Sequence, residues 1–123
     1  ISMKPIVLGA LQNAGVNLVT LANNHIMDYG VPGFEETLTR LEQSDIAFVG
    51  AGKTKAVRKQ PYIKEIKSKK IAILNVCEHE WITDAKSEAG ANGVDIIDHF
   101  TQIQELRDSV DFILQIGQRS EYQ

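Results

Sequence analysis

The sequence is poor in the residues that mark several common protein classes. It holds one cysteine, Cys77, so no disulfide can form within the chain, and a lone cysteine inside an apolar run is typical of a small core residue. No apolar run approaches the ~20 residues that a membrane-spanning helix needs, and the first residues lack the apolar region of a signal peptide. The sequence therefore predicts a soluble chain without a leader or a membrane span, and it leaves the native compartment open.

Positive charge is scarce as well. The 123 residues contain 13 Lys and Arg against 16 Asp and Glu, which gives a formal net charge of −3. The one dense basic run, residues 67–70, lies between two predicted strands and is typical of a solvated hairpin turn. A nucleic acid is therefore not an expected partner. An apolar fraction of 43% suits a globular core, and the length suits one domain or part of one.

Helical and strand-like segments alternate along the first half of the chain. Pro5 suits the first turn of a helix and Gly15 its end, and branched apolar residues then predict a strand over 16–21. A helix over 33–43 and a strand over 46–49 follow. This order predicts an α/β fold with a parallel sheet and right-handed crossovers. The second helix carries its apolar residues on one stripe, formed by Phe34, Leu38 and Leu41.

The second half of the chain has a different pattern. Alternating residues over 62–66 and a nearly continuous apolar run over 71–76 predict a hairpin whose second strand is fully buried. Either Asp95 or Asp98 can cap a following helix, and a last strand is expected over 112–116. The buried side of that helix is expected to carry Phe100, Ile103 and Leu106.

Polar residues follow two of the predicted strands at the point where each strand ends. Because ligands of open α/β folds bind at the carboxyl ends of the strands, we expect both groups at one functional edge. Imidazole, carboxylate and amide oxygen donors can together bind a divalent ion such as Mn, Fe, Zn or Mg. They are few for a two-metal site, in which the ions lie ~3.5–4 Å apart. The candidates are Asn24, His25, Asp28, Glu78, His79 and Glu80.

Each of these residues also has a purely structural interpretation. An Asn-Asn-His corner can satisfy loose backbone groups after a strand, and Asp28 can cap the next helix. His79, between two glutamates, can be a solvated loop residue. The Gly50-Ala-Gly52 stretch lacks the third glycine of a dinucleotide fingerprint, so we expect a tight turn there rather than a phosphate site.

A specific motif covers the first polar corner. Residues 22–30 read Ala-Asn-Asn-His-x-x-Asp-x-Gly, a pattern far more specific than any single glycine motif. It is followed in order by Gly33-Phe-Glu-Glu-Thr-Leu38, Phe48-Val-Gly-Ala-Gly52, Lys70-Ile-Ala-Ile-Leu74, Cys77-Glu-His-Glu80 and Gly90-Ala-Asn-Gly-Val-Asp95. From about residue 5 to residue 114, the chain resembles the CapA family (PGA_cap), the bacterial capsule and poly-γ-glutamate synthesis proteins.

The resemblance implies a layered, metallophosphoesterase-like α/β sheet with flanking helices and a metal-binding edge. It implies that Asn24 is a metal-ligand amide and that His25 lies over the scissile phosphate as an acid or charge stabiliser, while Asp28 belongs to the same motif. The implied role is capsule polysaccharide or poly-γ-glutamate biosynthesis. The implied chemistry is metal-dependent hydrolysis or transfer at a phosphoester or related bond.

The chain departs from the family pattern at two places. The family begins with a strand ending in a metal-binding Gly-Asp, and this chain starts after it. The family also carries a His-Gly-Gly-x-Glu-Tyr type motif after the last strand, where this chain reads Gln115-Ile-Gly-Gln-Arg-Ser-Glu-Tyr122, without the histidine. Residues 1–123 are therefore expected to be a single, partial CapA-like domain whose catalytic centre is incomplete.

Two functional hypotheses follow from these observations. In the first, the domain serves capsule polymer synthesis or export through a metallophosphoesterase-like site, with weak or no turnover in this chain. In the second, it is a non-catalytic accessory or binding module of a capsule-synthesis complex. Capsule-synthesis machinery is the expected partner in either case. Self-association is expected as well, because missing strands would leave one sheet edge unpaired.

Overall fold

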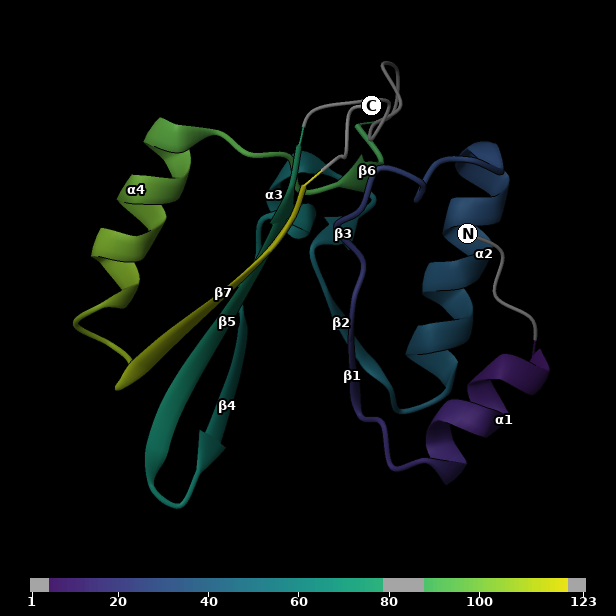
Figure 1. The fold of residues 1–123 in the computed structure, drawn as a ribbon, viewed down its shortest axis with the longest axis horizontal. Coiled ribbons are helices and arrows are strands. Elements are labelled where there is room, and N and C mark those ends of the chain that lie inside the picture. Colours follow the sequence, from purple (N-terminus) through teal and green to yellow (C-terminus); the bar gives the residue numbers. More distant parts are fainter. Residues whose placement is uncertain (1–4, 79–87, 120–123) are drawn as a thin grey trace.

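A computed structural model describes residues 5–78 and 88–119 of the chain, which form helices and strands in an α/β arrangement (Figure 1). The first half contains α1 (Pro5–Asn13), β1 (Leu18–Thr20), α2 (Gly30–Gln43), β2 (Ala47–Val49), β3 (Ala51–Gly52) and α3 (Lys55–Arg58). The second half contains β4 (Tyr62–Ile66), β5 (Lys69–Cys77), β6 (Gly90–Ala91), α4 (Ile96–Leu106) and β7 (Phe112–Gln118). The predicted fold class is confirmed.

Strands β1 and β2 are parallel, as the order of elements predicts, and α2 connects them. Gly15 lies just beyond α1 with φ +80, where its N–H donates to the Gln12 carbonyl at 3.0 Å. The next N–H, of Val16, donates to the Leu11 carbonyl at 3.0 Å. These two bonds satisfy carbonyls left open at the helix end. Glycine adopts this left-handed backbone without strain, and the turn directs the chain into β1.

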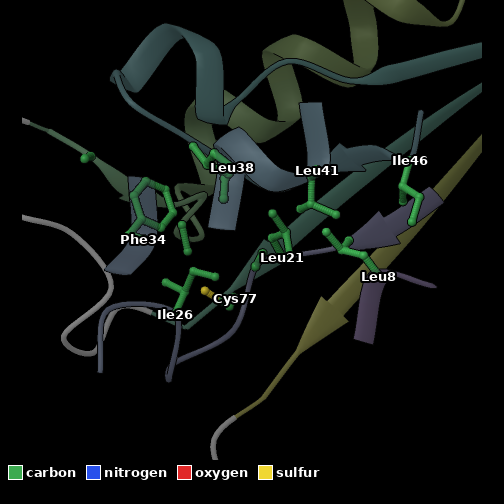
Figure 2. Close-up of a cluster of buried hydrophobic side chains, with 12 residues drawn as sticks. Leu8, Leu21, Ile26, Phe34, Leu38, Leu41, Ile46 and Cys77 are labelled. Carbon is green, nitrogen blue, oxygen red and sulfur yellow. The ribbon is translucent and has the colours of Figure 1, made fainter. Parts of the chain in front are cut away.

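The core lies between α2 and the strands. Phe34, Leu38 and Leu41 form the predicted stripe of α2 and are 1%, 2% and 0% exposed. Their side chains pack with apolar residues from several other elements (Figure 2). Cys77 is fully buried in the same cluster, which confirms its interpretation as a small core residue. The other labelled members of the cluster are Leu8, Leu21, Ile26 and Ile46.

A second sheet has the order β4-β5-β7. Strands β4 and β5 form the predicted antiparallel hairpin, and β7 pairs with β5 in parallel. The turn is made by Lys67 and Ser68, whose φ angles of 50° and 66° match the two-residue turns that suit twisted hairpins. Figure 1 shows α1 and α2 on one side of the strands and α4 on the other.

The structure corrects two expectations about sheet organisation. The described strands form three small sheets (β1-β2, β3-β6 and β4-β5-β7) rather than one continuous sheet. Only Gly50 makes the expected turn, since Ala51 and Gly52 form β3 and pair with β6 in antiparallel fashion. Such a two-residue strand depends on a partner about 40 residues away in sequence, so local pattern does not reveal it.

The structure corrects the predicted buried side of α4 at Phe100, whereas Ile103 and Leu106 are half-buried. Asp95 caps this helix as expected, since its Oδ1 accepts from the Asp98 N–H at 3.1 Å. However, Lys59 Nζ contacts Asp98 Oδ2 at 2.6 Å, and Gln102 Nε2 donates to the Lys59 carbonyl at 2.7 Å. These contacts turn the Asp98–Gln102 side inward, and Phe100, which lies about half a turn away between them, is 62% exposed.

Strand β7 forms one edge of its sheet among the described strands. It carries no charged residue, and two of its large apolar side chains, Phe112 and Leu114, are 59% and 50% exposed. Charged side chains commonly protect sheet edges from pairing with another chain. The strand therefore has the character of the unpaired edge that the sequence predicts, and self-association through it stays a prediction.

Candidate functional site

The end of β1 is fixed to the second sheet by a buried asparagine. Asn75 lies on β5 and is 2% exposed. Its Oδ1 accepts from the Ala22 N–H at 2.8 Å, and its Nδ2 donates to the Ile116 carbonyl at 3.1 Å. A buried polar group is stabilising only when it is paired, and here both ends of the amide are. Asn75 thus places the chain just before the Asn-Asn-His corner beside β5 and β7.

The first residue of the corner has a structural role. Asn23 Oδ1 accepts from the His25 N–H at 2.9 Å, and its Nδ2 donates to the Leu21 carbonyl at 3.3 Å. Ile26, 2% exposed, anchors the same turn in the core. The alternative in which this corner satisfies local backbone groups is therefore confirmed for Asn23.

His25 and Asp28 face each other across the corner. His25 Nδ1 lies 2.9 Å from Asp28 Oδ2, and both side chains are more than half exposed. The prediction that Asp28 caps the next helix is wrong, because the residue preceding α2 is Tyr29 and makes no side-chain cap bond. A carboxylate beside Nδ1 orients the imidazole ring. The contact is water-exposed, so its contribution to stability is small.

The second polar corner is described in part. Glu78 directly follows β5, where its N–H donates to the Gln118 carbonyl at 3.3 Å. Its Oε1 lies 3.8 Å from Arg119 Nε, in a loose ion pair. His79 and Glu80, the other two predicted ligands of this corner, lie outside the described residues.

Gln118 is the site residue that sequence reasoning missed. Its Nε2 donates to Asn24 Oδ1 at 3.2 Å, and its Oε1 accepts from the Asn24 N–H at 3.3 Å. The two residues are 94 positions apart. The signal available in the sequence was positional, since Gln118 ends a strand parallel to β5 and so reaches the same edge as Glu78. The prediction that the two corners share an edge therefore agrees with the geometry, with Gln118 between them.

The described residues do not form a complete metal site. Their amide, carboxylate and imidazole donors suit a divalent ion chemically. Yet no group of three or more His, Cys, Asp or Glu within residues 5–78 and 88–119 is arranged to hold one. Instead Asn24 pairs with Gln118, His25 with Asp28, and Glu78 with Arg119.

Cys77 lies beside this edge but is not a candidate nucleophile. Burial, and secondly the charge of Glu78, raise the pKa of the thiol to about 11. The thiolate is the reactive form, so the side chain is inert at neutral pH. Because the neutral thiol is favoured in the fold, its contribution to stability is present below the unfolded pKa, near 9, and is lost as pH rises toward 11.

Comparison with known sequences gives consistent matches. The profile of the family described as bacterial capsule synthesis protein PGA_cap matches residues 1–114. The capsule biosynthesis protein CapA of Bacillus anthracis is 38% identical over 52 residues, which is 42% of this chain and 13% of that protein. The uncharacterized protein y4sH of Sinorhizobium fredii is 34% identical over 65 residues, 53% of this chain and 14% of that protein. The chain thus spans about one seventh of these relatives.

Proposed function

The chain belongs to the family of bacterial capsule synthesis proteins, and on that premise we propose that it serves the synthesis or export of a capsular polymer. A capsule polysaccharide or poly-γ-glutamate is the proposed product of the pathway. The observation that carries the proposal is the match over residues 1–114, which includes both polar corners. No helix among the described residues is long and apolar enough to cross a membrane.

The proposed chemistry of the intact parent is metal-assisted hydrolysis or transfer at a phosphoester. Support comes from the convergence of Asn24 and Glu78 on Gln118 at one edge, with the His25–Asp28 pair in the same corner. His25 is the proposed acid or charge stabiliser, because Asp28 Oδ2 lies 2.9 Å from its Nδ1 and can orient the exposed ring. The described donors are too few for a metal centre, and we propose that it is completed by His79, Glu80 or residues elsewhere in the protein. This chain alone is expected to show weak or no turnover.

A non-catalytic accessory role is the second candidate. It is favoured by one feature of the site, namely that Asn24, His25 and Glu78 each have a protein partner. Under this proposal the corner is strand-to-helix structure, and the domain contributes a binding surface to a capsule-synthesis complex. The unpaired edge of β7 is the proposed place of association with another chain.

Capsule yield in cells tests the proposal and separates the two candidates. We expect in-frame deletion of the gene for the parent protein to lower surface polymer strongly, because the family serves its synthesis. Complementation with the unchanged gene should restore the polymer, and the His25→Ala variant should not if the site is catalytic. The Gln104→Ala variant, at an exposed position of α4, is the matched control and should restore it.

Two results would count against these proposals. Unchanged polymer after deletion would contradict the capsule role itself. Full restoration by His25→Ala, with the variant protein present at normal level, would contradict the catalytic candidate and leave the accessory role.

A further inference from the structure

Gln118 contacts the first polar corner through its side-chain amide and the second through its backbone carbonyl. Its Oε1 accepts from the Asn24 N–H, and its Nε2 donates to Asn24 Oδ1 at 3.2 Å and, more weakly, to the Arg119 carbonyl at 3.4 Å. Its backbone carbonyl accepts from the Glu78 N–H. Rotating the side-chain amide by half a turn would break the bonds of both ends, so the orientation is fixed.

The pair of bonds between Asn24 and Gln118 forms a clasp with anchored ends. Gln118 is held in register with Cys77 of β5, and Asn75 fixes Ala22, two residues before Asn24. The Asn24 side-chain oxygen, the atom that would ligate a metal, is therefore directed toward the end of β7. Its neighbour there is an amide N–H, whose hydrogen carries partial positive charge and repels a cation.

The surroundings of the second corner also disfavour the binding of a cation. Arg119 follows Gln118 and lies 3.8 Å from the Glu78 carboxylate through its guanidinium. A cation approaching this edge meets a carboxylate that is already paired with a positive group. The charge of Glu78 is thus partly compensated before any metal arrives.

We infer that Gln118 competes with a divalent metal ion for the Asn24 side-chain oxygen and holds this edge closed by an amide clasp. The inference rests on the metal part of the proposed function, since it concerns the same oxygen. A metal ion that takes the lone pair of Asn24 Oδ1 to which Gln118 Nε2 donates displaces that N–H, and the clasp then opens. Gln118 is consequently a positioning residue, which acts on the site through Asn24.

Removing the clasp should therefore strengthen metal binding while loosening the corner. Gln118→Met keeps the length of the side chain and removes its polar atoms, and Gln118→Asn keeps an amide that is one methylene too short to reach. The matched control is Gln115→Met, an exposed position on the same strand. Mn²⁺ alone is titrated and followed by water proton relaxation, and hydrogen exchange of the Asn24 N–H is measured without metal.

We expect both Gln118 variants to bind Mn²⁺ about three- to tenfold more tightly than the unchanged chain, since one hydrogen bond less must be broken. The Asn24 N–H should exchange faster by a similar factor, and Gln115→Met should change neither quantity. Equal or weaker Mn²⁺ binding in the Gln118 variants would overturn the competition. If exchange accelerates but no variant binds Mn²⁺, the competition and the metal part of the proposed function both fail. If the unchanged chain binds Mn²⁺ and the Gln118 variants bind it no better, this inference alone fails.

Discussion

Replacing Gly50 with alanine should destabilise the fold by about 2–6 kcal/mol, because two separate costs add. Gly50 has φ +93, a region in which a side chain is strained by about 1–3 kcal/mol. A Cβ at this position would lie 2.0 Å from Asn75 Oδ1 and 2.9 Å from the Ala22 Cβ. Asn75 cannot retreat without leaving the buried Ala22 N–H unpaired, which costs about 1–3 kcal/mol more.

The measurement is the free energy of unfolding in urea. Domains of this size have about 5–15 kcal/mol in total, so Gly50→Ala should unfold at much lower urea concentration or fail to fold. Gly117→Ala is the matched control, since that glycine has open space around its missing Cβ and no positive φ. We expect the control to lie within about 0.5 kcal/mol of the unchanged chain. If the Gly50→Ala variant also unfolds within about 0.5 kcal/mol of the unchanged chain, the close packing of Gly50 against Asn75 described here would be wrong.

Replacing Asn75 with leucine should have the second large effect, about 2–4 kcal/mol of lost stability. Leucine keeps the branched shape of asparagine but is larger and apolar, so crowding at this buried position adds to the loss of the hydrogen bonds. The substitution leaves the Ala22 N–H and the Ile116 carbonyl without their side-chain partner. The Ala22 bond is buried, so water cannot replace it freely.

Urea unfolding again gives the result, with Gln104→Leu on exposed α4 as the control. The free energy of unfolding of this control should stay within about 0.5 kcal/mol of the unchanged chain, because glutamine and leucine are both good helix formers and the position is exposed. In the Asn75→Leu variant, hydrogen exchange of the Ala22 N–H should also become faster, and by a larger factor than the exchange of the α4 amides. A loss below about 1 kcal/mol would mean that Asn75 does not join the two sheets as described.

The sequence revealed the features that depend on local pattern. The stripe of Phe34, Leu38 and Leu41 predicted the buried face of α2, and the alternation in β4 followed by the apolar run in β5 predicted the hairpin. Parallel pairing of β1 with β2 followed from the order of elements. These signals are strong because helix and strand periodicities differ and because burial repeats along each element.

Features set by distant contacts were not accessible in this way. Asn75 sits inside an apolar run, and nothing near it in sequence indicates that its amide pairs with Ala22, 53 positions away. The exposure of Phe100 follows from the contacts of Asp98 and Gln102 with Lys59, which no periodicity encodes.

In the candidate site too, some features follow from local sequence and others from distant contacts. Its location at the ends of β1 and β5 could be predicted, because polar residues follow apolar strands there. The partners of those residues could not be, since Gln118 lies 94 positions from Asn24 and Arg119 lies in the segment where the family motif departs. For the predicted ligands His79 and Glu80, which lie outside the described residues, the roles stay predictions.

Metal content, measured by elemental analysis after purification without chelator, shows whether this edge needs a metal ion. Protein hydrogen bonds, above all the Asn24–Gln118 clasp, hold the described part of the edge together. We therefore expect far less than one transition-metal ion per chain, both in the unchanged protein and in Asn24→Ala/His25→Ala. One ion or more per chain, lost in the double variant, would contradict this expectation and place a working metal centre at the Asn-Asn-His corner.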